Sequence, residues 1–284
     1  MRTYLDCIPC FFDQALRAAR MAKVNQKKQK EVLERLAKEV PNLSLKSSPP
    51  EIGRIVYRIV GKITGKKDPL KELKNRSNQV ALSFYPYLKK KVNLAKDKLE
   101  RAVRLAIAGN IIDFARGNYL DFGKKDIEDV LKKDFGIFDY QKFKEALKNV
   151  NQILYLADNA GEVVFDRILI EELIKLNKKI IYVVKDKPVI NDALKEDAEF
   201  CGIDKIAKVV SNGSDVPGTI LKFCSKQFLD FYKKADLIIS KGQGNFEGLS
   251  DEKIPIFFLF RVKCRVVAND VGSKVGDIIL KSNL

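Results

Sequence analysis

The chain has 284 residues, 46% of them hydrophobic, which is enough to bury one large core or two modest ones. It contains no histidine, so histidine bases, Ser-His-Asp triads, phosphohistidine chemistry and histidine-ligated zinc are excluded. The formal net charge of +16 makes nucleic acid or an anionic substrate a candidate partner. Because the lysines are spread along the whole chain, we favour a lysine-rich thermophile surface as the explanation.

The chain begins with a cysteine pair, Cys7-Ile8-Pro9-Cys10. Two cysteines at this spacing can form a redox pair, half of a second metal site, or two packed thiols, and the sequence leaves these possibilities open. No apolar run is long enough to span a membrane, and no signal peptide precedes the pair. We therefore expect a cytoplasmic protein that does not bind membranes.

The first half of the chain shows helical periodicity. Apolar residues recur three and four positions apart over 11–40, 49–63, 69–85 and 96–116, and two further charged helices are expected within 118–150. Asn110 and Asp113 lie three apart on one side of their predicted helix. They could face solvent, or they could be buried with polar partners. We expect residues 1–148 to form an all-helical cap region, with no strand before Ile153.

Residues 151–192 have the pattern of a β-α-β unit. Apolar runs at Ile153–Ala157 and Ile180–Val184 predict two buried strands, and Glu162 opens the helix between them. Parallel strands of such a unit end at the same edge of a sheet, where ligands bind in open α/β folds.

Polar residues follow both of these strands. Asp158 and Asn159 come after the first, and Asp192 lies beyond the second. Two carboxylates and an amide are hard oxygen ligands suited to Mg²⁺ or Mn²⁺. The alternative is that Asp158 and Asn159 merely cap the helix that follows them.

The remainder of the chain alternates between helices and strands, which predicts a parallel sheet with helices on its faces. Strands are expected at Ile206–Val210, Asp236–Ile239, Ile256–Phe260 and Val266–Ala268, and helices at Ala193–Phe200 and Ile220–Phe231. The order of the strands in the sheet cannot be derived from this pattern.

Four consecutive predicted strands end in polar clusters: Asp158-Asn159, Lys185, Ser211–Asp215 and Ser240–Glu247. At one edge of a sheet, Lys185 and Lys241 would place cations beside the carboxylates, and the glycines near Lys241 would let backbone N–H groups approach an anion. These are the requirements of phosphoryl chemistry, although four ordinary polar loops remain the alternative. Neither a P-loop nor a dinucleotide-binding motif is present.

Four motifs, in this order, resemble those of the DUF89 damage-control phosphatases. They are Asp158-Asn159-Ala160-Gly161-Glu162 with Phe165-Asp166, Lys185-x-x-Pro188-x-x-Asn191-Asp192, Ser214-Asp215-x-Pro217-Gly218-Thr219, and Lys241-Gly242-Gln243-Gly244-Asn245-Phe246-Glu247. The cysteine pair resembles subfamily I of that family, which occurs in archaea. The resemblance covers nearly the whole chain.

The resemblance implies an α/β fold with a helical N-terminal region, 1–148, and a three-layer α/β/α Rossmann-like core, 149–284, whose sheet is mostly parallel. It implies a metal-dependent phosphatase of small phosphomonoesters, such as sugar phosphates, damaged nucleotides or related metabolites. The implied divalent ion is Mn²⁺ or Ni²⁺, with Co²⁺ or Mg²⁺ possible. The implied metal ligands, which are also the catalytic residues, are Asp158, Asn159 and Asp192. The implied substrate-binding residues are Asn110, Asp113, Lys185, Lys241, Gly242, Asn245 and Glu247.

A metal-bound water could then do the work of the missing histidine base. Asp158 could instead act as a covalent nucleophile, but a ligand role fits better because the neutral Asn159 lies beside it. Two other functions stay open: a phosphometabolite-binding protein without turnover, and a nucleic-acid-binding protein, which the dispersed lysines disfavour. The oligomeric state is not predicted.

Overall fold

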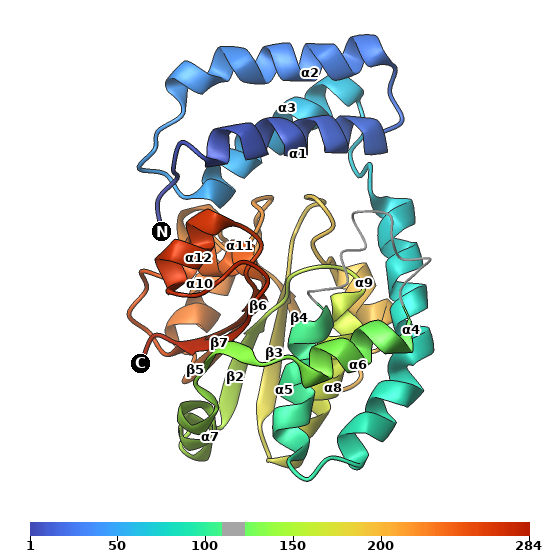
Figure 1. Cartoon of the computed structure of the whole chain (residues 1–284), viewed down its shortest axis with the longest axis vertical. Helices are drawn as coiled ribbons and strands as arrows, with labels where there is room; N and C mark the ends of the chain where they lie inside the picture. Colours follow the sequence, from blue (N-terminus) through green and yellow to red (C-terminus); the bar gives the residue numbers. More distant parts are fainter. Residues whose placement is uncertain (110–122) are drawn as a thin grey trace.

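A computed structural model describes residues 1–109 and 123–284 of the chain. Three N-terminal helices lie across one end of the molecule, and the rest of the described chain forms a sheet with helices around it (Figure 1). The predicted α/β class is confirmed. None of the described helices combines the length and the apolar character that crossing a membrane requires.

The three N-terminal helices pack around a core of their own, to which Phe11, Ala15, Val32, Leu36 and Val56 contribute. They are α1 (Cys7–Met21), α2 (Gln26–Glu39), which a short 3₁₀ turn η1 (Val40–Asn42) follows, and α3 (Pro49–Thr64). Local sequence explains the ends of α3. Ser48 and Glu51 form a capping box before it, and Gly65, with φ of 70°, ends it in the left-handed region.

The strand order in the sheet is β1-β7-β6-β5-β2-β3-β4 for the described residues. The strands are β1 (Phe135–Phe138), β2 (Gln152–Leu156), β3 (Lys179–Val184), β4 (Lys208–Ser211), β5 (Leu237–Lys241), β6 (Ile256–Arg261) and β7 (Ile278–Ser282). Strands β2 to β6 pair in parallel, whereas β7 is antiparallel to β6, and β1 is parallel to β7. The sheet is therefore mostly parallel, as predicted.

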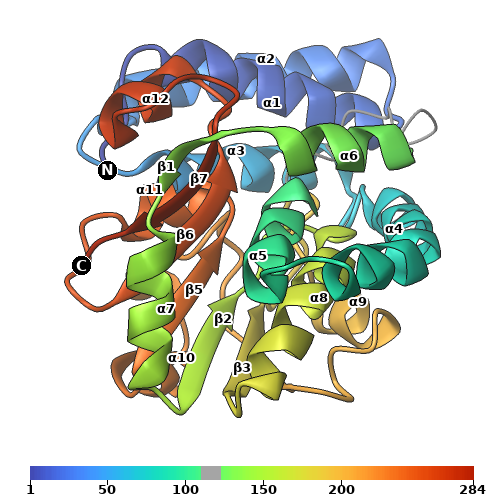
Figure 2. The ribbon, with the colours of Figure 1, turned by 60° about the horizontal axis from the view of Figure 1, so that its bottom comes forward.

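Helices cover both faces of the sheet. Side chains alternate along the strands, so that Tyr155 of β2 belongs to one hydrophobic cluster and its neighbour Leu154 to the other. The first cluster includes side chains of α4 (Lys71–Asn93), α5 (Lys98–Gly109), α6 (Lys124–Lys132), α7 (Tyr140–Lys148), α8 (Glu162–Lys175) and α9 (Lys195–Phe200). The second includes side chains of α10 (Lys226–Lys233), α11 (Gln243–Leu249) and α12 (Arg265–Val271). Figure 2 shows α5 and α8 on the near face of the strands.

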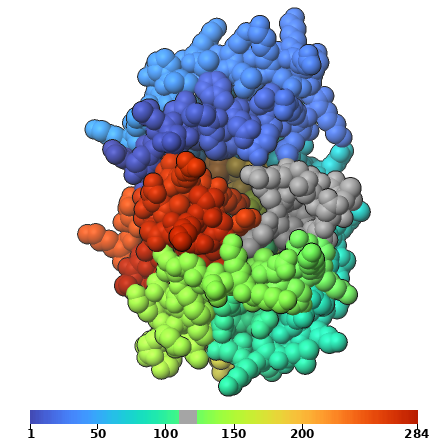
Figure 3. Space-filling model, in the orientation of Figure 1, coloured from blue at the N-terminus to red at the C-terminus, as the bar shows by residue number. Residues whose placement is uncertain are grey.

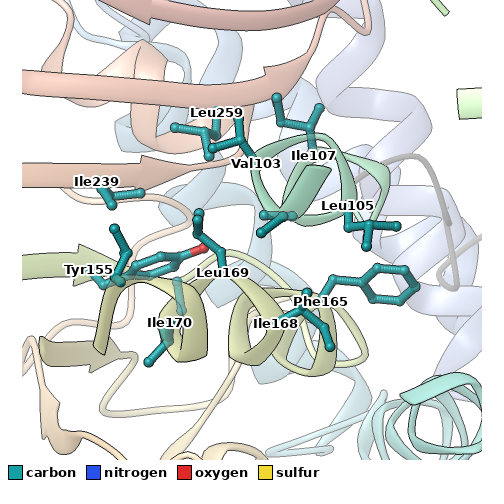
Figure 4. Close-up of a cluster of buried hydrophobic side chains, with 14 of the residues drawn as sticks. Val103, Leu105, Ile107, Tyr155, Phe165, Ile168, Leu169, Ile170, Ile239 and Leu259 are labelled. Carbon is teal, nitrogen blue, oxygen red and sulfur yellow. The ribbon is translucent and has the colours of Figure 1, made fainter. Parts of the chain in front are cut away.

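Helix α8 is buried on all sides because α5 covers the face that does not meet the sheet. Figure 4 shows Val103, Leu105 and Ile107 of α5 beside α8, and Tyr155 and Ile239 on the sheet side. The two helices approach closely at Gly109, where a Cβ would lie 3.0 Å from the Cβ of Phe165. This packing fixes α8, whose first residue follows the polar end of β2.

Three features of the fold differ from the sequence predictions. Residues 1–148 are not all helical, because Phe135–Phe138 forms β1, a four-residue edge strand too short for its periodicity to identify. Val266–Ala268 is not a strand but part of α12, which Cys264 precedes and Gly272 ends in the left-handed region. The helix expected at Ile220–Phe231 is divided into a 3₁₀ turn, η4 (Leu221–Phe223), and α10.

The division into two domains at residue 148 stays a prediction. Helices α4 to α7 precede or overlap that boundary, yet their side chains belong to the same cluster as strand residues such as Ile153 and Ile239. The helices that have a separate core are α1 to α3.

Candidate active site

The polar strand ends meet where the order of strands changes direction. From β2 the chain continues to β3 and β4 on one side, and then returns to form β5 on the other side of β2. The loops after β2 and β5 therefore diverge, and crevices of this kind bind ligands in open parallel sheets. Asp158 follows β2 and Gly242 follows β5, so both residues lie at this point.

Backbone contacts bring the three expected metal ligands together. The N–H of Ala193 donates to the carbonyl of Asp158 at 2.9 Å. Asn159 and Asp192 face each other in an antiparallel bridge. The loops after β2 and β3 therefore run side by side, with the two carboxylates and the amide on them. The role of these residues as metal ligands stays a prediction.

The carboxylate of Asp158 rests against the backbone of Gly242. This glycine has φ of 83°, and a Cβ on it would lie 2.0 Å from Asp158 Oδ2. Gly218 has a similar role in the loop after β4: its φ is 66°, and a Cβ would lie 2.3 Å from the carbonyl oxygen of Gly244. Glycine is thus needed at both positions for conformation and for space.

Asn159 connects two acidic side chains. Its Nδ2 donates to Asp158 Oδ2 at 2.9 Å and to Glu162 Oε1 at 2.7 Å. Ionised carboxylates only accept hydrogen bonds, so the amide must turn its NH₂ group toward them. The Oδ1 of Asn159 accepts no hydrogen bond from the residues that the structure describes, which leaves this oxygen available to a cation.

Lys241 lies beneath these residues with its side chain fully buried. Its Nζ donates to Asp166 Oδ1 at 2.6 Å and to Glu162 Oε2 at 3.2 Å. Asp166 also accepts hydrogen bonds from the hydroxyls of Tyr155 and Tyr182, both at 2.8 Å. These carboxylates raise the pKa of Lys241 against the lowering effect of its burial. The contacts account for a buried lysine without any contact to phosphate.

Lys185 pairs with Asp192. Its Nζ lies 3.6 Å from Asp192 Oδ2 and also donates to the carbonyl of Gly218. The N–H of Gly218 donates to the same carboxylate oxygen at 3.4 Å. Burial raises the pKa of Asp192 to about 6, although Lys185 and this N–H oppose the rise. Lys185 therefore holds the carboxylate in place and favours its charged form.

Buried charges at this edge of the sheet do not balance. Among the described residues, five carboxylates and three ammonium groups are buried there: Asp158, Glu162, Asp166, Asp192, Asp197, Lys74, Lys185 and Lys241. Burial raises the pKa of Asp158 well above its usual range, and the charge of Glu162 adds to that rise. With all eight groups ionised, this set has two more negative than positive charges, which one divalent cation would balance; unpaired buried charges are costly.

The donor set suits such an ion. No three His, Cys, Asp or Glu side chains in the described ranges gather as a metal-binding group. An ion at this place would therefore need Asn159 in addition to Asp158 and Asp192. Two carboxylates and an amide are the oxygen ligands that Mg²⁺ and Mn²⁺ take.

Comparison with known proteins identifies the family. The damage-control phosphatase ARMT1-like domain matches residues 3–279. The chain belongs to this family. The resemblance to the DUF89 damage-control phosphatases is thereby confirmed, whereas the subfamily stays a prediction.

Similar proteins come from archaea. An uncharacterized protein of Methanocaldococcus jannaschii is 39% identical, over 97% of this chain and 93% of the relative. A Pyrococcus horikoshii protein named damage-control phosphatase is 35% identical, over 100% of this chain and 99% of the relative. Another so named, from Archaeoglobus fulgidus, is 35% identical over 80% of each chain. The crystal structure of a DUF89 family protein from Pyrococcus horikoshii, 35% identical and covered completely in both chains, superposes with a TM-score of 0.92.

Sequence reasoning missed three residues of this ARMT1-like domain that approach the carboxylates. Lys74 and Asn78 come from α4, and Tyr57 comes from α3. The negative charge of Asp192 raises the pKa of Tyr57 further after burial has raised it. A signal for the α4 pair was present, because the two polar residues lie four apart, on one side of the predicted helix.

The N-terminal helices are joined to the strand-end loops by ion pairs. Arg54 Nε lies 2.6 Å from Asp215 Oδ1, and Arg58 lies 2.9 Å from Asp215 Oδ2. Figure 3 shows a recess between these blue helices and the red C-terminal segment, where atoms of the α/β half are visible. The expected substrate-binding residues Asn110 and Asp113 lie outside the described residues.

Asn245 and Glu247 occupy different surroundings. Asn245 is buried, and its Nδ2 donates to the carbonyls of Ala157 and Lys241, so it joins the ends of β2 and β5. Glu247 accepts a hydrogen bond from Gln243 Nε2 at 2.8 Å. Burial raises the pKa of Glu247 to about 7, which Gln243 opposes.

The raised pKa of Glu247 predicts a pH-dependent stability. The Glu247 carboxyl group binds its proton more tightly in the folded protein than in the unfolded chain. Its contribution to stability is therefore fully present below pH 4.5 and is lost as the pH rises through 7. Glu247→Gln should remove this loss and be about 1–3 kcal/mol more stable than wild type at pH 8, with little difference at pH 5. Urea unfolding at both pH values tests this, with the exposed Glu145→Gln as control. Equal pH dependence of wild type and Glu247→Gln would contradict the prediction.

The cysteine pair lies in the first turn of α1. Burial raises the pKa of Cys7, and the charges of Glu247, Cys264 and Cys10 raise it further. A third cysteine, distant in sequence, is therefore near the pair. All three thiols are free, and a redox or second-metal role for Cys7 and Cys10 stays a prediction.

Proposed function

We propose that this ARMT1-like protein is a metal-dependent phosphomonoester hydrolase that acts on small phosphorylated metabolites, such as sugar phosphates or damaged nucleotides. The observation that carries the proposal is the excess of two buried negative charges at the point where β2 and β5 diverge. Membership of the family and two relatives named damage-control phosphatases support it.

Asp158, Asn159 and Asp192 would hold the ion, which we propose to be Mn²⁺ or Ni²⁺, with Co²⁺ or Mg²⁺ as alternatives. A bound ion of this kind polarises a phosphoryl oxygen and lowers the pKa of a water molecule, so no histidine base is needed. The protein's own groups position the carboxylates. Lys185 and the N–H of Gly218 hold Asp192, and the amide of Asn159 connects Asp158 to Glu162.

A phosphate-release assay tests the proposal. The purified full chain is given sugar phosphates and nucleotides with Mn²⁺, Ni²⁺, Co²⁺ or Mg²⁺ in turn, and excess EDTA serves as control. We expect phosphate release with at least one ion and none with EDTA. Asp192→Asn should raise the metal concentration for half-maximal activity at least about tenfold. Asp186→Asn, an exposed carboxylate in the same loop, should leave it unchanged.

Three results would count against the proposal. Phosphate release that EDTA does not affect, or an unchanged metal requirement in Asp192→Asn, would refute the ligand set. Binding of metal and phosphate without release of phosphate from any ester would instead show a binding protein without turnover.

A further inference from the structure

Lys74 is a buried lysine that none of the sequence motifs includes. It lies in the first turn of α4, and its side chain is 1% exposed. Its Nζ lies 2.8 Å from Asp68 Oδ2, in the loop before the helix. Lysines are almost never fully buried unless they are paired, so the contacts of this ammonium group require an explanation.

The single ion pair does not satisfy the ammonium group. It carries three N–H donors. Its contact with Asp68 lacks hydrogen-bond geometry, and no other residue in the described part of the chain accepts a hydrogen bond from Nζ. Buried polar groups almost always have partners, so donors that find no acceptor among the described residues are available to a ligand.

The neighbouring groups place this ammonium at the candidate active site. The positive charge of Lys74 opposes the rise in pKa of both Asp192 and Asp197. One turn along α4, Asn78 donates to Asp197 at 2.6 Å and accepts from the N–H of Gly161 at 2.7 Å, immediately before α8. Asn78 thus fixes α4 to the loop that carries Asp158 and Asn159.

The other two buried lysines at this edge have partners for their donors. Lys241 donates to Asp166 and Glu162, and Lys185 donates to the carbonyl of Gly218 beside Asp192. Of the three, Lys74 is the one whose ammonium group has no hydrogen-bond acceptor among the described residues. A group with several negative oxygens on one atom, such as a phosphate, would supply the hydrogen-bond acceptors that this ammonium group lacks.

We propose that Lys74 is a substrate-binding residue whose ammonium group donates to the phosphoryl oxygens of the substrate. This inference rests on the proposed phosphatase function and assigns the phosphate contact to Lys74 rather than to Lys241. Asp68 holds the ammonium in position while the site is free of substrate. Because phosphate is also a product of the reaction, inorganic phosphate should bind to the same group and compete with substrate.

The test compares Lys74→Met with Lys71→Met, an exposed lysine in the same turn of α4. Two experiments are done on each folded variant. Kinetics give KM, kcat and the inhibition constant of inorganic phosphate, and thermal unfolding gives the rise in Tm that inorganic phosphate causes in the presence of the metal. Lys74→Met should weaken phosphate binding and raise KM by about ten- to hundredfold, since a hydrogen bond to a charged group is lost. Its metal requirement should stay at the wild-type value, and Lys71→Met should match wild type throughout.

A second variant, Asp68→Asn, tests whether Lys74 binds substrate or only pairs with Asp68. Its result does not depend on whether Lys74→Met folds. If Lys74 binds phosphate, Asp68→Asn removes a competing carboxylate and should keep or strengthen phosphate binding. A loss of phosphate affinity in Asp68→Asn, or unchanged phosphate affinity in Lys74→Met, would overturn the inference.

The Tm measurement also distinguishes failure of this inference from failure of the proposed function. The Tm measurement needs no turnover. If the wild-type protein binds phosphate but hydrolyses no ester, the phosphatase function is refuted, and the role of Lys74 in binding phosphate can still be tested. Turnover with unchanged phosphate affinity in Lys74→Met would refute only the inference. Absence of both phosphate binding and phosphate release in wild type would refute both.

Discussion

Gly242→Ala should reduce phosphatase activity by at least about 100-fold, because a misplacement of reacting groups by about 1 Å can have that effect. The added Cβ would lie 2.0 Å from Asp158 Oδ2, closer than any two such atoms can approach. The carboxylate or the backbone of residue 242 must therefore shift, which disturbs the contact of Asp158 with Asn159. The variant should also lose about 1–2 kcal/mol of stability, because φ of 83° is unfavourable for alanine.

A second glycine offers a matched control for this backbone cost. Gly272 has φ of 77°, and a Cβ on it would have nothing within 4 Å. Gly272→Ala should therefore lose a similar amount of stability and keep full activity. The measurements are kcat/KM with saturating metal and the free energy of unfolding in urea. Full activity in Gly242→Ala would show that the position of Asp158 does not matter to the reaction, and equal losses of activity in both variants would show a general effect of strain.

The parts of the site that were predictable are those fixed by local sequence. A short apolar run followed by Asp158-Asn159 indicates the end of a strand, whatever the position of that strand in the sheet. The carboxyl ends of parallel strands all lie at the same edge of the sheet. The prediction that polar strand ends would gather needed no knowledge of strand order. It succeeded at the level of the backbone, where the loop with Asn159 pairs with the loop that carries Asp192.

What could not be predicted depends on segments that are distant in sequence. Strand β1 exists because Phe135–Phe138 finds β7 at the edge of the sheet, more than a hundred residues later. Lys74 reaches the site because Asn78 fixes α4 to the N–H of Gly161. The pairing of β1 leaves no periodic signal in the sequence, and the spacing of four between Lys74 and Asn78 does not reveal which residues they contact.

Lys241 shows how a correct motif can suggest an incomplete role. Its place at the end of β5 was predicted, and a lysine at a strand end suggested a phosphate contact. Its partners come from α8, where Glu162 and Asp166 lie four apart, on one side of the first turns of the helix. Two carboxylates on a buried helix face require a cation, and this local signal could have assigned Lys241 to them.

Lys241→Met should therefore destabilise the protein by about 3–5 kcal/mol, the usual result of removing one partner from a buried charge pair. Asp166 and Glu162 would be left without their cation, and the hydroxyls of Tyr155 and Tyr182 would be the remaining donors to Asp166. Burial already raises the pKa of Asp166, and loss of Lys241 would raise it further. Protonation of Asp166 would then remove the unpaired buried charge, so the variant should lose less stability at pH 5 than at pH 8.

The free energy of unfolding in urea, measured at both pH values, tests this expectation, with the exposed Lys234→Met as control. The double variant Lys241→Met/Asp166→Asn should recover part of the loss, because it removes a charge that has no partner. A purely phosphate-binding lysine would behave in the opposite way. Its removal would weaken phosphate binding and leave the unfolding free energy within about 0.5 kcal/mol of wild type, as for an ordinary surface substitution. That result would show that the buried ion pairs of Lys241 do not hold the site together.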